Sequence, residues 1–160
     1  MHNHKTGFVL AALALCVLLS GCGLGTTRTY MGFDKSEFPV VAEEDSHGGF
    51  LGDGSCYLIL DCASDPEKAL DLVRDWKPLP LSEPLRLLMY GGEGDDARYG
   101  YELAKEAHLP NIEHGYYKFI DRQAKDPADD SGVLGRYSFN FEIAAYDTDS
   151  NRFYYFKFDT

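Results

Sequence analysis

The stretch YSFNFEIAAYDTDSNRFYYFKFD, residues 137–159, decides the fold. Two runs rich in aromatic residues, 137–146 and 152–159, flank the segment Asp147-Thr148-Asp149-Ser150-Asn151. Aspartate, serine and asparagine favour turns because their short polar side chains bond to the nearby backbone. The pattern therefore predicts two antiparallel strands joined by a short turn.

The second of these strands is apolar on both faces. Phe153 and Tyr155 lie on one face, and the other carries Tyr154, Phe156 and Phe158. A single helix covers only one face of a sheet, so we expect an exposed aromatic surface that includes either Tyr154 or Tyr155. Such a surface suits a sugar, a peptide or a second subunit. The alternative is that cross-strand aromatic pairs and loops complete the core on both faces.

Upstream of this hairpin, residues 55–62 form a short apolar run that predicts a buried strand. A helix should follow, because Ser64-Asp65-Pro66-Glu67 supplies an N-cap, a proline in the first turn and a capping-box glutamate. Its apolar residues recur at helical spacing, at Ala69, Leu72, Val73 and Trp76. We expect Trp76 to be buried against the sheet.

Shorter elements complete the predicted domain. The pattern indicates a strand over 85–90, a loop over 91–96, a short helix over 101–108 and a strand over 116–121. The expected fold is α+β: a mainly antiparallel sheet of about five strands with one main helix packed on one face.

Two cysteines lie at the ends of the predicted strand over 55–62. Cys56 and Cys62 would share one face but stand about 20 Å apart at roughly 3.3 Å per residue. A disulfide requires Cα atoms within about 7 Å. We therefore expect both residues to be unpaired and buried as small hydrophobic side chains.

The N-terminal segment has the pattern of an export signal. Lys5 precedes the apolar run over 8–19, which is too short to span a bilayer as a helix. The tetrapeptide Leu19-Ser20-Gly21-Cys22 resembles the lipobox of bacterial lipoproteins. The resemblance implies that residues 1–21 are a signal peptide, that Cys22 is lipidated and becomes the mature N-terminus, and that the lipid holds the chain on the extracytoplasmic face of the cell membrane.

Two further segments follow the predicted lipidation site. Residues 22–49 mix glycine, threonine, proline and acids without a period, which predicts a flexible tether. Residues 50–160 are expected to form a single α+β domain.

The charge balance excludes one class of partner. The chain has 15 Lys+Arg and 26 Asp+Glu, and loss of Lys5 with the signal leaves 14 − 26 = −12. A body of this charge is repelled by phosphate backbones and by anionic lipids. We expect no nucleic-acid partner, and a membrane association that depends on the lipid.

No catalytic, metal or cofactor motif is complete. The run over 47–50, HGGF, is similar to the oxyanion loop of esterases, but no GxSxG elbow follows it. Asp147, Asp149 and Asn151 have the spacing that opens an EF-hand loop, yet Arg152 and Phe158 occupy its glycine and glutamate positions. The acidic loop over 126–130 is read as solvated. We predict no metal site, no cofactor and no catalytic residue.

The body also resembles a group of small proteins from Gram-positive bacteria that have no assigned activity. The matching stretches lie at 47–54, 76–81, 116–122, 137–141 and 154–160. They cover most of residues 47–160, and they imply similarity of the whole domain without indicating a mechanism.

The expected function is that of an extracytoplasmic lipoprotein acting as a binding or interaction module. Its partner would be an envelope protein, a peptide or a glycan, bound through Tyr154 or Tyr155. The alternative is a small hydrolase-like envelope enzyme, for which the candidate residues are His47, Asp53, His114 and Asp121.

Overall fold

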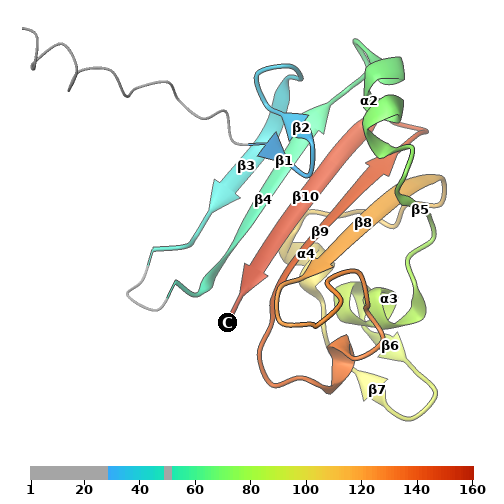
Figure 1. Cartoon of the computed structure of the whole chain (residues 1–160). Helices are drawn as coiled ribbons and strands as arrows, with labels where there is room; N and C mark the ends of the chain where they lie inside the picture. Colours follow the sequence, from blue (N-terminus) through green and yellow to red (C-terminus); the bar gives the residue numbers. More distant parts are fainter. Residues whose placement is uncertain (1–28, 49–51) are drawn as a thin grey trace, which may run out of the picture.

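The computed structural model describes residues 29–48 and 52–160. Its main sheet has six strands, all paired antiparallel, in the order β3-β4-β10-β9-β8-β5 (Figure 1). Their bounds are β3 Val40–Asp45, β4 Gly54–Asp61, β5 Lys77–Pro78, β8 Gly115–Asp121, β9 Asn140–Asp147 and β10 Arg152–Asp159. The predicted α+β fold with a mainly antiparallel sheet is confirmed.

The β9–β10 hairpin forms as the sequence predicts. Arg152 pairs with Asp147 at the turn, and Asp159 pairs with Asn140 at the far end. The Asp147 carboxylate accepts hydrogen bonds from the Asp149 N–H (2.9 Å) and the Ser150 hydroxyl (2.6 Å). Asn151 closes the turn at φ 51°, a left-handed conformation that asparagine tolerates better than most residues.

Two short helices and a 3-10 turn cover one face of the sheet, which we call the α3 face. They are α3 (Glu83–Tyr90), α4 (Leu103–Glu106) and η1 (Val133–Gly135). Leu85, Leu88 and Met89 of α3 pack in one core with Tyr154 and Phe156 of β10. A small hairpin of β6 (Gly92–Glu93) and β7 (Arg98–Tyr99) begins in the stretch predicted as a loop over 91–96 and ends beyond it.

The strand predicted over 85–90 is wrong, because these residues belong to α3. Its first turn contains Glu83 and Pro84, with Ser82 at the N-cap position. Gly91 ends it at φ 69°, where a Cβ would lie 2.6 Å from the Tyr101 carbonyl oxygen. A short apolar run does not distinguish a buried strand from a buried helix, and the terminal residues decide here.

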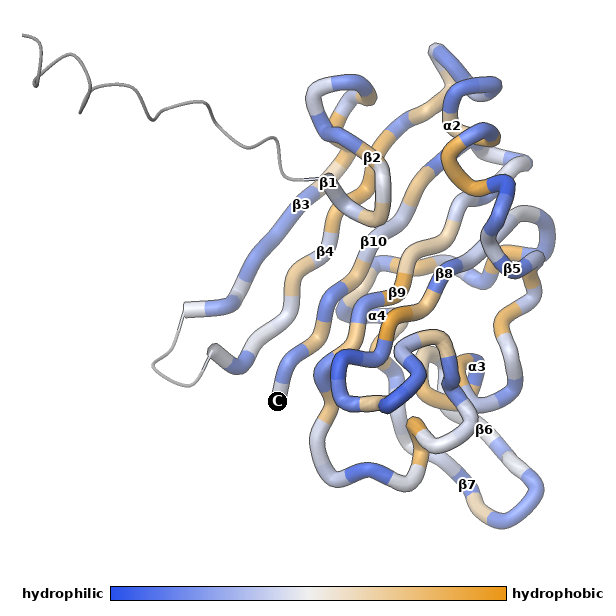
Figure 2. The backbone as a smooth tube through the Cα atoms, in the orientation of Figure 1, coloured by the Kyte–Doolittle hydropathy of each residue, from blue (hydrophilic) through white to orange (hydrophobic). Residues whose placement is uncertain are grey.

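The opposite face, which we call the α2 face, is covered by α2 (Pro66–Val73) and the hairpin of β1 (Thr29–Tyr30) and β2 (Phe33–Asp34). The Asp65 side chain caps α2 by accepting a hydrogen bond from the Lys68 N–H (3.1 Å). Trp76 is buried beside the Phe33 and Phe153 rings, as predicted. Hydrophobic residues run along the central strands and the inner side of α2, whereas the connecting loops are mostly hydrophilic (Figure 2).

The tether predicted over 22–49 is wrong for residues 29–48, which are part of the fold. Phe33 is fully buried and stacks on Phe153 with ring centroids 3.9 Å apart. β3 pairs with β4 as an edge strand, with a bulge between Val40 and Ala42. The aromatic residues of this segment are isolated and show no helix or strand period in the sequence. Each of them nevertheless fills a part of the α2 face that the two-turn helix α2 leaves uncovered. Residues 22–28, including Cys22, lie outside the described residues.

The exposed aromatic surface predicted at Tyr154 or Tyr155 is wrong as well. Tyr154 is 7 % exposed in the α3-face core, and Tyr155 is 4 % exposed in the α2-face core. Both faces of the central strands are covered, because the β1–β2 hairpin adds the layer that the sequence did not indicate.

Cys56 and Cys62 form no disulfide within residues 29–48 and 52–160 and are buried on the α2 face, as predicted. Burial, together with the nearby Asp61 carboxylate, raises the pKa of the Cys62 thiol to about 12. Both thiols are therefore part of the core packing.

Candidate functional site

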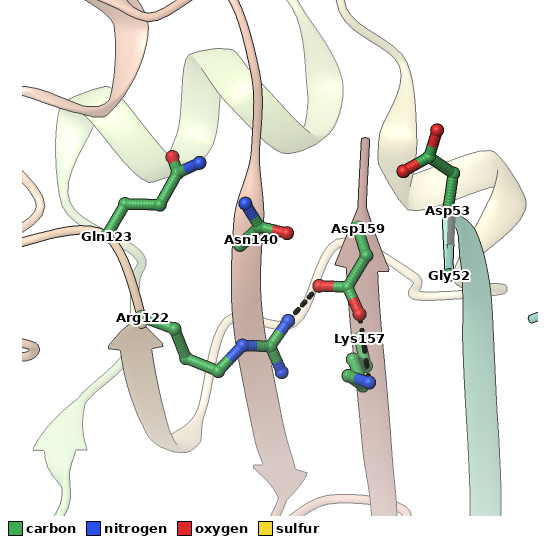
Figure 3. A pocket seen from close by; sticks show the side chains of 7 residues that line it. All are labelled: Gly52, Asp53, Arg122, Gln123, Asn140, Lys157 and Asp159. Atoms are coloured by element: carbon green, nitrogen blue, oxygen red, sulfur yellow. Dashed lines mark hydrogen bonds and ion pairs between the residues drawn. The ribbon is translucent and has the colours of Figure 1, made fainter. Parts of the chain in front are cut away.

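The apolar cover of the α2 face stops before the far end of the sheet, and a cleft opens there (Figure 3). Strand alternation places Lys157 and Asp159 on the same face as Phe153 and Tyr155. The cleft has a volume of about 500 Å³ and is lined by Gly52, Asp53, Arg122, Gln123, Asn140, Lys157 and Asp159. These residues lie just before β4, just after β8, at the start of β9 and at the end of β10.

Arg122 joins the three strands that form the floor of this cleft. Its backbone N–H donates to the Asn140 carbonyl (2.9 Å), which extends the β8–β9 ladder by one residue. Its guanidinium donates to Glu142 Oε1 on β9 (2.8 Å) and to Asp159 Oδ1 on β10. The planar donor fork of arginine suits contacts to two carboxylates at once.

Asp159 is the centre of the charged network. Besides Arg122, it contacts the Lys157 ammonium (2.9 Å) and His47 Nε2 (3.2 Å). The His47 contact lacks the alignment of a hydrogen bond, and Nε2 is shielded from solvent. His47 Nδ1 lies 2.6 Å from Asp45 Oδ1, so the end of β3 is tied to the end of β10 through one imidazole.

A glycine allows His47 to reach this position. A Cβ on Gly54 would lie 2.9 Å from the His47 backbone, and Gly54 has φ 152°, where other residues are strained. Gly54, at the start of β4, therefore admits the His47 backbone.

Two amide side chains complete the floor. With its amide oxygen and nitrogen exchanged, Asn140 donates to Asp159 Oδ1 (3.2 Å) and accepts from the Gln123 amide. Gln123 Nε2 also donates to the Ser138 hydroxyl (3.2 Å). The floor is thus one layer of linked polar groups that spans β8, β9 and β10.

The floor is anchored to the apolar core at Glu142. Its Oε2 accepts a hydrogen bond from the Tyr155 hydroxyl (2.9 Å), while its Oε1 accepts from Arg122. The Tyr155 ring makes an edge contact with Tyr30 of β1, with centroids 5.0 Å apart. The charged groups are held by packed side chains, which limits their rotamers.

The structure does not bring the four candidate enzyme residues together. Asp53 lines the cleft, and His47 contacts its Asp159. Asp121 is 1 % exposed on the α3 face, where it pairs with Arg136 and accepts from the Gln123 N–H (2.9 Å). His114 lies at the opposite end of the sheet, 2.8 Å from Asp149, and both side chains are about two-thirds exposed.

The sequence reasoning missed Arg122, Gln123, Asn140, Lys157 and Asp159. One signal was present: along β10 the face that begins with Phe153 and Tyr155 continues with Lys157 and Asp159. A change from apolar to charged along one face marks the point where the covering layer ends.

Within residues 29–48 and 52–160, no three His, Cys, Asp or Glu side chains are placed to hold a metal ion. The helices of the same residues are too short and too polar to cross a membrane.

Comparison with known proteins gives no relative. No protein-family model matches the chain, and no curated protein or solved structure matches it either. The resemblances to bacterial lipoproteins and to small Gram-positive proteins therefore stay predictions.

Proposed function

We propose that this chain is a lipid-anchored, extracytoplasmic binding module whose ligand site is the charged cleft at the end of the α2 face. The observation that carries the proposal is the contact of Asp159 with Arg122, Lys157 and His47 in an open cleft. Polar groups that converge on a concavity can fix the orientation of a ligand, and about 500 Å³ falls within the usual volume of ligand sites, roughly 300–1,000 Å³.

The burial of both tyrosines removes them as ligand contacts and moves the candidate site. Tyr154 packs in the core of the α3 face, and Tyr155 supports the cleft from below through Glu142. The expected partner class, an envelope protein, peptide or glycan, is unchanged. What changes is the chemistry of recognition, from aromatic contact to polar contact.

The anchor rests on the sequence Leu19-Ser20-Gly21-Cys22, and the fold limits how far the body can stand from the lipid. Six residues, 23–28, separate Cys22 in the sequence from Thr29, where β1 begins. Seven Cα steps at no more than about 3.6 Å span about 25 Å. The anchor would therefore hold the β1 end of the body within this distance of the lipid.

A two-part experiment tests this function. First, phase partitioning in detergent compares the exported chain with Cys22→Ala, which should move to the aqueous phase. Second, the detergent-solubilised full chain is incubated with purified cell-envelope fragments, and bound protein is quantified after sedimentation. Arg122→Gln and Gln123→Ala should each reduce binding at least tenfold.

Arg74→Gln is the matched control for the second part. Arg74 pairs with Asp71 on α2, away from the cleft, and is 64 % exposed, so its loss removes the same charge without touching the site. Thermal unfolding checks that each variant is folded. Equal binding of the folded cleft variants and Arg74→Gln would refute the cleft as the ligand site, and membrane retention of Cys22→Ala would refute the anchor.

A further inference from the structure

The floor of the cleft is electrically balanced within itself. Arg122 pairs with Glu142 and Asp159, and Lys157 pairs with Asp159, so two cations face two carboxylates. At the floor, an anion would have to displace Asp159 or Glu142 from its cation, and a cation would have to displace Arg122 or Lys157 from its carboxylate; Asp53, which also lines the cleft, stands outside these pairs at the rim. A neutral ligand meets the floor without that cost.

The same floor offers many donors and acceptors side by side. The amides of Asn140 and Gln123 each carry a carbonyl oxygen and two N–H donors. Lys157 has three donors, of which Asp159 is the partner of one. A hydroxyl group both donates and accepts, so a ligand rich in hydroxyl groups can bond to adjacent groups of either kind.

Two other classes of ligand fit less well. Among residues 29–48 and 52–160, no aromatic or large aliphatic side chain lines the cleft, which disfavours an apolar ligand. Extended peptides gain affinity from main-chain bonds along a sheet edge, whereas the floor consists of side chains from β9, β10 and the two residues that follow β8. The long free edge of this sheet is β3, and it ends in the acids Glu43, Glu44 and Asp45.

We infer that the cleft binds a neutral, hydroxyl-rich glycan, through hydrogen bonds from Gln123, Asn140 and the free donors of Arg122 and Lys157. This inference rests on the proposed function and specifies its ligand class. Asp53 at the rim has no ion-pair partner among residues 29–48 and 52–160, and its carboxylate is a further acceptor for ligand hydroxyl groups.

Three tetrasaccharides that differ in charge test the inference. The probes are the tetramer of N-acetylglucosamine, which is neutral, the tetramer of glucosamine, which is cationic, and the tetramer of galacturonate, which is anionic. Each is titrated into the full-length protein in detergent micelles by calorimetry at low and high salt. We expect the neutral probe to bind at least tenfold more tightly than either charged probe, with less than a twofold change between the two salt concentrations.

Variants connect the binding to the cleft. Gln123→Ala removes a floor amide but no charge, and it should weaken the neutral probe at least fivefold, while Arg74→Gln should leave it unchanged. Asp53→Asn alters the rim without touching the ion pairs of the floor, and it should weaken binding at least twofold. If Gln123→Ala fails to fold, the affinity of Asp53→Asn for the neutral probe still tests whether that probe binds in the cleft.

The possible failures are distinguishable from those of the proposed function. Tighter binding of a charged probe, a steep salt dependence, or no binding of any tetramer would overturn the glycan inference. If envelope fragments are nevertheless captured by the wild type and lost by the cleft variants, the proposed function stands with a different ligand. If that capture is also insensitive to the cleft variants, both proposals are wrong.

Discussion

The Tyr155 hydroxyl donates a hydrogen bond to Glu142 at the point where the α2 face changes from apolar to charged (2.9 Å). On one side of this bond lie buried rings such as Tyr30 and Phe153, and on the other lie the floor groups of the cleft. The pair fixes a carboxylate that also accepts from Arg122. It therefore connects the packing of the core to the geometry of the cleft.

Tyr155→Phe should lower the free energy of unfolding by about 1.5 to 3 kcal/mol, the usual contribution of a hydrogen bond to a charged group. The measurement is urea unfolding followed by circular dichroism. Tyr154→Phe is the matched control, because the Tyr154 hydroxyl has no hydrogen-bond partner within the described residues and its ring is equally buried. Equal losses in the two variants would contradict the role of the Tyr155–Glu142 bond.

Phe33→Ala should destabilise the protein by about 3 to 5 kcal/mol, because it removes a fully buried ring from the α2-face core. The change tests whether the segment 29–48 belongs to the fold. Ser36→Ala in the same segment is the control, since Ser36 is exposed and bonds only to Asp34 nearby. If Phe33→Ala lowers the free energy of unfolding by less than about 0.5 kcal/mol, segment 29–48 is a tether and not part of the fold.

The pKa of His114 should lie above the usual range for a histidine side chain. The hydrogen bond and charge of Asp149 raise its pKa, with smaller contributions from Glu113 and Asp147. Because the folded-state pKa is the higher one, the stabilising contribution is complete below the unfolded pKa and is lost as pH rises through the folded pKa. Proton NMR of the His114 ring measures the value directly.

Asp149→Asn should bring the pKa of His114 down toward that of an ordinary histidine and remove the corresponding pH dependence. The pair is exposed, so salt should weaken the effect in the wild type. An unchanged His114 titration in Asp149→Asn would show that the ion pair does not form in solution.

Cys56 and Cys62 should resist alkylation in the native protein. Both are buried, and the pKa of the Cys62 thiol is raised to about 12, so almost no thiolate is present at neutral pH. Mass spectrometry of peptides containing each cysteine should find modification only after unfolding in denaturant. Modification of Cys62 in the folded protein at neutral pH would contradict its burial.

The elements with strong local signals were predictable. The β9–β10 hairpin has two aromatic runs around a turn-forming pentapeptide, and α2 has an aspartate N-cap, a proline and a glutamate in its first turn before its apolar stripe. The α3 error has a different origin. Leu85 to Tyr90 is an apolar run that is compatible with either state, and the signals that favour a helix lie outside the run, in Glu83 and Pro84 before it and Gly91 after it.

The cleft was not predictable, because it is formed where long-range packing stops. Whether Lys157 and Asp159 face solvent depends on how far the β1–β2 hairpin extends over β10, and Tyr30 and Phe33 gave no periodic signal. Arg122 and Asn140 are distant in the sequence and become neighbours only through the register in which β8 pairs with β9. Of the residues predicted for an enzyme, Asp53 lines the cleft and His47 borders it through Asp159.

Hydrogen–deuterium exchange of the full-length protein, with and without purified cell-envelope fragments, tests the central claim most directly. The account predicts slower exchange in peptides covering 52–54, 118–123, 138–142 and 157–160, the segments that form the cleft. Peptides from α2, α3 and α4 should exchange at unchanged rates. Protection confined to the helices, or to the β3 edge, with no change in the four cleft segments would contradict the cleft as the binding site.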